Sequence, residues 1–149
     1  MSKVLKCNNY QWQGVDRKDY KSATSCYKGV HRYSLLGERE DEQELNFQTR
    51  YFEVEEGGYT SLEFHQHPHS VVVIRGGGMM VLDNNIYELS LHDVVYISPG
   101  TLHQFHADAN KKLGFICVVD RYRDRPTLPD EDYLDERVAN PEVKKKIRK

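Results

Sequence analysis

Three of the chain's seven histidines are crowded into five residues, where they take every second position of the stretch HQHPH (His65, His67 and His69). In a β-strand, residues i and i+2 lie on the same face, about 7 Å apart along the strand. His65 and His67 can therefore point at one ion from the same side of a strand, so the spacing suits a metal site. Surface histidines at a sheet edge are the alternative, because so short a pattern often matches by chance.

The residues just before the histidines alternate between polar and apolar side chains. Ser61 and Glu63 share the strand phase of the histidines, whereas Leu62 and Phe64 fall on the opposite face. A barrel strand with polar residues inside and apolar residues outside inverts the usual arrangement of a core. Such an inversion makes sense if the barrel interior is a functional site and something else covers the exterior.

A second stretch, PGTLH, strengthens the interpretation of the histidines as metal ligands. In PGTLH, Pro99 and Gly100 are followed by His103. The two stretches together resemble the cupin superfamily, which are small double-stranded β-helix (jelly-roll) proteins with one motif of the form G…HxH…E…G and a second of the form GD…PxG..H…N. The resemblance covers about residues 47–120, and the matching residues are Gly58, His65, His67 and Gly76 for the first motif, and Asp93, Pro99 and His103 for the second.

The chain also departs from the family pattern. The place of the usual glutamate is taken by His69 or Ser70, depending on the spacing used, and His69 is the better candidate because imidazole is a common metal ligand. His92 replaces a glycine of the second motif, and Ala107 replaces its asparagine. The resemblance thus implies one divalent transition metal (Zn, Mn, Fe or Ni) with the ligands His65, His67, His69 and His103.

Four neutral imidazoles leave the +2 charge of such an ion uncompensated, which favours a small anionic ligand. Two side chains are candidates for catalysis. Glu63 is placed to carry a proton or to accept a hydrogen bond from a histidine N–H. Cys117 shares its strand phase with Phe115 and Val119, so its thiol lies near the ion if that phase faces the interior, although a free cysteine often simply packs.

Three further residues are candidates for contact with substrate. Arg50 could meet an anionic substrate, with surface pairing to Glu53 or Glu55 as the alternative. Tyr59 and Tyr96 are candidates for the edge of the pocket.

Cupins include isomerases, decarboxylases, dioxygenases, lyases and simple binding proteins, so the fold does not fix the reaction. The site favours a metal-dependent isomerase or lyase acting on a small anionic metabolite, a sugar phosphate or a keto acid. A dioxygenase is the alternative enzyme, and a non-catalytic metal- or small-molecule-binding cupin is the alternative to an enzyme. There is a weaker similarity to the cupin-type methylthio-xylulose phosphate methylsulfurylases, which carry a cysteine on a late strand beside the metal, as Cys117 would be here.

The elements that must position these residues are short strands separated by turn residues, which predicts an all-β jelly-roll barrel. Asn84 and Asn85 suit a two-residue hairpin turn. We expect an N-terminal extension with one strand (residues 1–45, strand 29–36), a cupin barrel (46–120) and a C-terminal tail of short helices (121–149), in which Asn140 caps a helix that starts at Pro141. The expected barrel strands are 47–54, 59–67, 71–76, 79–83, 86–90, 93–98, 102–107 and 113–120.

Composition sets the outer limits. The chain has 149 residues, 38% of them hydrophobic, which fits one globular domain, and its net charge of −2 gives no electrostatic reason to bind nucleic acid or acidic membranes. We expect a cytoplasmic protein, because three scattered cysteines argue against a disulfide framework and no signal or membrane-spanning segment is evident. We also expect a homodimer, because Leu62, Phe64 and the outward residues of 71–76 would leave an apolar sheet face in water unless the strand at 29–36 covers it.

Overall fold

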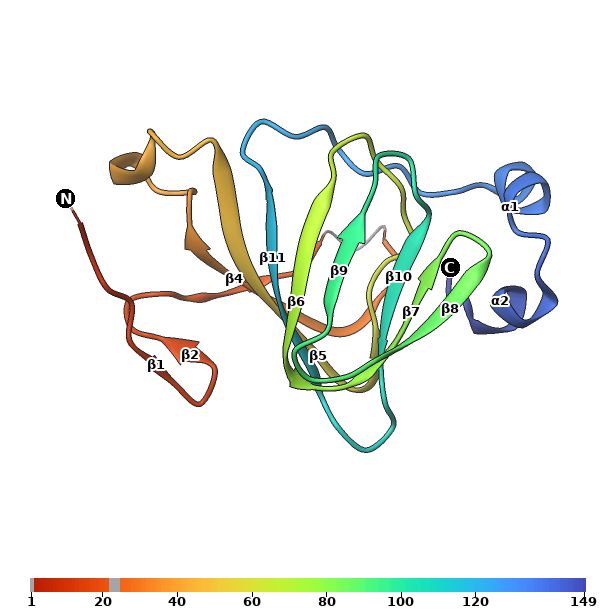
Figure 1. The fold of residues 1–149 in the computed structure, drawn as a ribbon, viewed down its shortest axis with the longest axis horizontal. Coiled ribbons are helices and arrows are strands. Elements are labelled where there is room, and N and C mark those ends of the chain that lie inside the picture. Colours follow the sequence, from red (N-terminus) through yellow and green to blue (C-terminus); the bar gives the residue numbers. More distant parts are fainter. Residues whose placement is uncertain (1, 22–24) are drawn as a thin grey trace.

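The computed structural model of the protein describes residues 2–21 and 25–149 (Figure 1). Its main feature is a curled antiparallel sheet in the order β8-β7-β10-β5-β11-β6-β9, extended by β4, which pairs with β5, and by β3. A separate small hairpin, β1–β2, lies near the N-terminus. The strands are β1 (Cys7–Asn8), β2 (Gln11–Trp12), β3 (Arg17–Asp19), β4 (Lys28–Leu36), β5 (Phe47–Tyr59), β6 (His69–Gly76), β7 (Gly78–Leu82), β8 (Asn85–Leu89), β9 (Val94–Ile97), β10 (His103–Ala107) and β11 (Leu113–Asp120).

Two short helices, α1 (Glu131–Arg137) and α2 (Pro141–Lys146), follow the last strand, and a 3₁₀ turn, η1 (Glu40–Glu42), precedes β5. The Asn140 side chain accepts a hydrogen bond from the backbone of Glu142, and Pro141 begins α2, as predicted. The predicted all-β barrel with short C-terminal helices is confirmed. No helix in the described part of the chain is both long and apolar enough to cross a membrane.

The N-terminal region differs from expectation, because the structure has four strands where the sequence predicted one. The small hairpin packs on the outside of the sheet, where the Trp12 ring lies 5.0 Å from the ring of the fully buried Tyr51. The hairpin turn between β7 and β8 is shifted by one residue. Leu82 pairs with Asn85, so the turn residues are Asp83 and Asn84, and Asp83 adopts the positive φ of 48°.

The largest difference concerns the predicted strand at 59–67. Between Tyr59 and the start of β6 at His69, the chain makes only isolated bridges, from Glu63 to His103 and from Phe64 to Thr127. Pro68 has no N–H to contribute to a ladder. The backbone N–H groups of Gln66 and His67 are instead taken by the carboxylate of Asp124, at 2.8 and 2.9 Å. The histidine segment is therefore a turn tied to the C-terminal tail, and the prediction of a regular strand is wrong.

The apolar outer face of this segment is covered within the chain. Leu62 is buried in a cluster with Val81 and Leu102, under side chains of the two C-terminal helices such as Leu134. The Phe64 ring stacks on the ring of Tyr133, with centroids 4.4 Å apart. Leu62 and Phe64, two of the residues that motivated the homodimer prediction, are thus covered by α1 and α2. Ile74, from the outward side of residues 71–76, packs instead with the N-terminal hairpin. The dimer stays a prediction.

Inside the barrel, alternate residues of the strands form the core. On β11 the buried side chains are Leu113, Phe115, Cys117 and Val119, the phase expected from the sequence. On β5 the residues Arg50, Phe52 and Val54 are buried on the inner side. The core fills one part of the barrel and leaves a cavity at the other.

Candidate metal and substrate site

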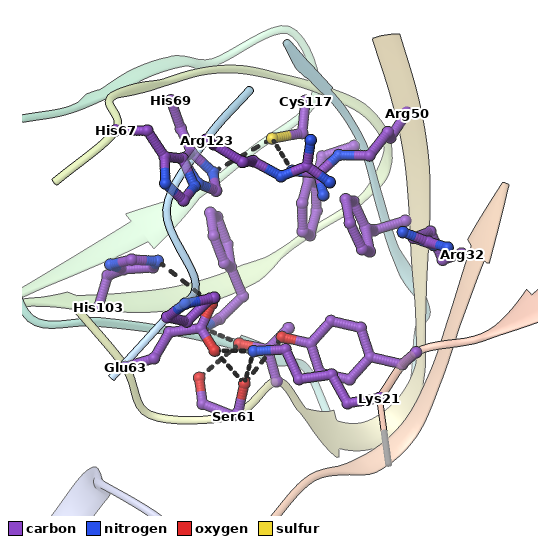
Figure 2. Close-up of a pocket in the computed structure, with 16 residues that line it drawn as sticks. Lys21, Arg32, Arg50, Ser61, Glu63, His67, His69, His103, Cys117 and Arg123 are labelled. Carbon is purple, nitrogen blue, oxygen red and sulfur yellow. Dashed lines mark hydrogen bonds and ion pairs between the residues drawn. The ribbon is translucent and has the colours of Figure 1, made fainter. Parts of the chain in front are cut away.

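The cavity has a volume of about 180 Å³. Histidines and Glu63 line one end, three arginines line the other, and the rings of Phe52, Phe105 and Phe115 form an apolar wall. Figure 2 shows Cys117 between the histidine end and the arginine end. We use these two names below for the group His65, His67, His69, His103 and Glu63, and for the group Arg32, Arg50 and Arg123.

The histidine end contains a group that could hold a metal ion. One nitrogen from each of His65, His69 and His103 lies within 4.8 Å of the others. His65 and His103 are buried, at 2% and 3% exposure, which excludes most of the water that would otherwise satisfy them. The Nε2 atoms of His65 and His69 are buried and have no hydrogen-bond partner among the described residues. Two orphaned nitrogens facing one space fit a metal ion better than they fit a packed core.

The rings of His65 and His103 are oriented by hydrogen bonds at Nδ1, the nitrogen that does not face the metal group. His65 Nδ1 lies 2.8 Å from the His67 carbonyl, and His103 Nδ1 lies 2.9 Å from the Thr101 carbonyl. A carbonyl only accepts, so both Nδ1 atoms carry the proton and both Nε2 atoms carry the lone pair. A backbone partner that fixes the tautomer in this way is the usual support of a metal-binding histidine.

His67 lines the cavity but lies outside the group of three. Its ring stacks on that of His65, with centroids 3.6 Å apart and planes 6° from parallel. Its Nδ1 is 2.7 Å from Asp124 and donates to that carboxylate, which leaves the lone pair on Nε2 available to a metal ion. Hydrogen bonds from the Gln66 backbone and then from His67 hold the pKa of Asp124 well below its usual range, so this carboxylate stays charged.

Burial lowers the pKa of all four imidazoles because it removes water from the charged form. For His65 the pKa falls to about 4, and the neighbouring imidazoles add to the effect of burial. The pKa of His69 and that of His103 are lowered mainly by burial, and for His103 the Glu63 carboxylate opposes the shift. These side chains are therefore neutral at physiological pH, which is the form that binds metal.

Glu63 is a buried, charged carboxylate beside the histidines. Burial alone would raise its pKa, but Lys21 and His103 hold the pKa below the usual range. Its Oε2 is paired with Lys21 and accepts a 2.5 Å hydrogen bond from Ser61. Its Oε1 lies 4.0 Å from His103 Nε2 (Figure 2). Glu63, which the sequence offered as a proton carrier or as a partner of a histidine N–H, therefore lies beside the histidines, with its charge balanced by Lys21.

Cys117 connects the two ends of the cavity. Its Sγ lies 3.2 Å from His69 Nδ1 and accepts a 3.5 Å hydrogen bond from the Arg50 guanidinium (Figure 2). Burial raises the pKa of the thiol, and Arg50 opposes that shift. The side chain is only 1% exposed, yet it borders the cavity, so its contacts are polar as well as apolar.

Arg50 faces this cavity and not the surface. Glu53 lies on the other side of β5, where it binds Arg75 and Lys112, so a pair between Arg50 and Glu53 would have to cross the sheet. The alternative of a surface ion pair for Arg50 is wrong. Successive residues of a strand point to opposite faces, which is the physical reason.

Other predicted site residues lie elsewhere. Ser70 is exposed on the outer side of β6, where it pairs with Tyr96, itself 68% exposed. Tyr59 is half-buried, with its hydroxyl 3.7 Å from Cys26 Sγ. Ser70, Tyr59 and Tyr96 do not border the main cavity in the described part of the chain.

Sequence reasoning missed four residues at the site: Lys21, Arg32, Arg123 and Asp124. All four lie outside residues 46–120. Arg32 is in the predicted strand at 29–36, and the other three are in segments for which the sequence predicted no strand or helix. Charged residues near a chain end usually mark a solvated surface, and only the long-range contacts, such as that from His67 to Asp124, bring these to the barrel mouth.

Comparisons with known proteins identify the family of the chain. Residues 50–119 match the model of the family described as the cupin domain. The chain is 38% identical over 125 residues to a 1-methylthio-D-xylulose 5-phosphate methylsulfurylase from Rhodospirillum rubrum, an overlap of 83% of this chain and 78% of that protein.

Two solved structures are similar over nearly the whole chain. A cupin 2 conserved barrel domain protein from Rhodopseudomonas palustris has 38% identity and a TM-score of 0.88, with 99% of this chain and 100% of that chain covered. A cupin 2 domain-containing protein from Halorhodospira halophila has 43% identity and a TM-score of 0.77, with 99% and 96% covered. The likeness therefore includes the N-terminal extension and the C-terminal tail.

Proposed function

The chain belongs to the cupin family, and from that premise we propose that it is a metal-dependent enzyme acting on a small anionic metabolite of the sugar-phosphate kind. One observation carries the proposal. The Nε2 atom of His69, orphaned among the described residues, borders a cavity that also contains a charged carboxylate and a thiol, and His65, whose Nε2 is likewise orphaned, belongs to the same group of three histidines. Packing alone does not require so many titratable side chains around one space.

We assign the metal to His65, His69 and His103 through their Nε2 atoms. The fourth donor is His67, whose Nε2 is left free by its bond to Asp124. Glu63 is the competing fourth donor, because its Oε1 lies near His103. A bound divalent ion would polarise a carbonyl or phosphoryl oxygen of the substrate. Imidazole ligands suit Zn, Fe and Ni by affinity and allow Mn by availability, so the donors admit several metals.

The proton-carrying roles fall to two side chains. Glu63 holds its negative charge through Lys21 and Ser61, both at Oε2, which leaves Oε1 turned toward His103 and able to accept a proton. Cys117 Sγ borders the cavity beside His69 and is the second group that can hold a proton there. General acid–base assistance of this kind contributes about 10²–10⁴-fold in rate.

The name of the Rhodospirillum rubrum relative indicates which substrate to test first. A methylthio-substituted pentulose phosphate is small and anionic, which suits the cavity and the anionic ligand expected from the sequence. A non-catalytic binding role is the alternative, and it differs from the proposal by the lack of turnover.

The first experiment measures metal content and turnover together. Purified protein is analysed for transition metals and assayed with 1-methylthio-D-xylulose 5-phosphate before and after chelation. We expect about one metal per chain and a rate that is lost on chelation and restored by metal. Bound metal without any turnover of phosphorylated sugars would favour the binding role.

A pair of variants tests the ligand assignment. His69→Ala should remove most of the metal, whereas His92→Asn should keep it, because His92 is an exposed turn residue with a φ of 74° that asparagine tolerates. Metal retained at full occupancy in His69→Ala would reject the assignment. Comparing His67→Ala with Glu63→Gln then decides the fourth donor, since only removal of the true donor weakens metal binding.

A further inference from the structure

The arginine end of the cavity is not explained by metal binding. Arg32 comes from β4, Arg50 from β5, and Arg123 from the segment that follows β11, yet all three border the same space. Figure 2 shows Arg32 and Arg50 on the far side of the cavity from the histidines, with Arg123 reaching in between. Three segments distant in sequence thus bring like charges together.

These guanidiniums lack the partners that buried charges normally have. Arg50 is 7% exposed, and its Nε atom has no hydrogen-bond partner in residues 2–21 and 25–149. Within the described part of the chain, its one hydrogen bond goes to Cys117 Sγ. The Nε of Arg32 is likewise buried without a partner in that part of the chain, and its nearest carboxylate is that of Glu38, at 4.0 Å. Buried charges without partners are costly, so an absent partner is expected.

Arg123 fits the same pattern. Its NH1 donates to the Gln48 side chain at 2.8 Å and to the Asp120 carbonyl at 3.1 Å. Both acceptors are uncharged, so these bonds aim the guanidinium without neutralising it. Burial lowers the pKa of Arg123, and repulsion from Arg50 and Arg32 adds to this effect. The three positive charges therefore repel one another.

The charge at the rest of the cavity does not supply that anion. Glu63 is paired with Lys21, so these two charges cancel. Glu38 is half-exposed, with 35% of its side chain accessible, and stands at the rim beside Arg32. The arginine end therefore keeps an excess of positive charge.

We propose that Arg32, Arg50 and Arg123 form the subsite that binds the phosphate group of a phosphate monoester. The proposal deepens the proposed function and rests on it for the reaction, but not for the binding. A phosphate dianion has three terminal oxygens and about two negative charges, which match several guanidinium forks. A monocarboxylate offers two oxygens and one charge, and would leave at least one guanidinium uncompensated.

The subsite also sets the direction in which the substrate lies. With phosphate at the arginine end, the remainder of the molecule extends along the wall of Phe52 and Phe115 toward the histidine end. Cys117 then lies beside the middle of the substrate, since it contacts both Arg50 and His69. Arg32 and Arg123 lie outside residues 50–119, the part that matches the family model, so phosphate recognition belongs largely to the flanking segments.

The test is to titrate the whole chain with inorganic phosphate at constant ionic strength. Calorimetry measures the phosphate affinity. Arg123→Gln and Arg32→Gln should each weaken phosphate binding about tenfold or more, as expected for loss of a charged hydrogen-bond donor. Arg125→Gln is the matched control. It removes the same charge two residues from Arg123, at an exposed position that does not border the cavity, and should change binding less than about twofold, as surface charges usually do.

Arg50→Gln is tested as well, with circular dichroism to check that it folds, because Arg50 is buried. If this variant does not fold, the variants of the two less buried arginines keep the test valid. The titration is repeated after chelation. Phosphate binding that survives chelation and falls in the Arg123 and Arg32 variants supports the subsite, whatever the metal assay shows. Binding that disappears on chelation, or that matches the Arg125 control in both variants, overturns the subsite and leaves the metal proposal standing.

Discussion

The two ends of the cavity are built in opposite ways. At the histidine end, the rings of His65 and His103 are each held by a backbone carbonyl two residues away. The orientation of these two rings is therefore fixed by the chain next to them. At the arginine end, the side chains come from β4, β5 and the tail, and they meet only in the folded protein. On the proposals above, the barrel supplies the histidines that would hold the metal, and the flanking segments supply two of the three arginines that would bind phosphate.

The two ends also differ in how they tolerate an empty site. Burial lowers the pKa of the histidines, so their imidazoles are neutral and repel one another little even when no ligand is bound. Guanidiniums stay charged, so the arginine end is held together against repulsion. We expect anion binding to stabilise the folded protein, and each prediction below asks whether the two ends act separately.

The largest effect is expected from His103→Ala. The variant should lower metal affinity by more than about 100-fold, beyond the loss typical of outer partners of a ligand. Phosphate affinity should change less than about twofold. Competition with a chromophoric chelator measures the first quantity and calorimetry the second, and a parallel fall in both would show that the ends are one site.

Cys117→Ser is expected to separate catalysis from binding. If the thiol moves a proton, turnover should fall about 100-fold while metal content and phosphate affinity stay near those of the unmodified protein. Steady-state assays on metal-loaded protein measure the rate. An unchanged rate would return Cys117 to a packing role and leave Glu63 as the proton carrier.

Two neighbouring residues provide a sharper comparison with a smaller effect. Asp124→Asn removes the charged partner of His67, and should weaken metal binding about tenfold. Arg123→Gln, one residue earlier, should leave metal binding unchanged and weaken phosphate binding. The comparison fails if both variants alter both affinities, because the tail would then act as a single support.

The smallest effect is expected from Glu38→Gln. Removing this carboxylate at the rim takes away the only negative charge within 4.0 Å of Arg32 in the described residues, so phosphate should bind about two- to fivefold more tightly. The gain should shrink at high salt, which screens a half-exposed charge. Weaker phosphate binding in this variant would mean that Glu38 orients Arg32.

Sequence patterns were sufficient for the barrel and for much of its interior. The alternation in LGFICVVD predicted the inner phase of β11, including Cys117, because side chains alternate strictly across a strand. The turn residues predicted where most of the strands are separated along the chain, with an error of one residue at Asp83 and Asn84. The spacing of the histidines singled out His65 and His67, and the resemblance to the cupins added His69 and His103. The structure brings His65, His69 and His103 together and leaves His67 outside that group.

Only the tertiary structure decided what surrounds those histidines. The alternating pattern around His67 predicted a strand, but the Asp124 carboxylate binds two backbone N–H groups there and bends the segment into a turn. Whether Leu62 and Phe64 needed a second subunit depended on where α1 and α2 would pack. Likewise Arg32 and Arg123 carry no mark of function in the sequence. The physical reason is common to all three cases: periodicity reports the face on which a side chain lies, whereas a charge or an apolar face finds its partner through contacts between segments far apart in the chain.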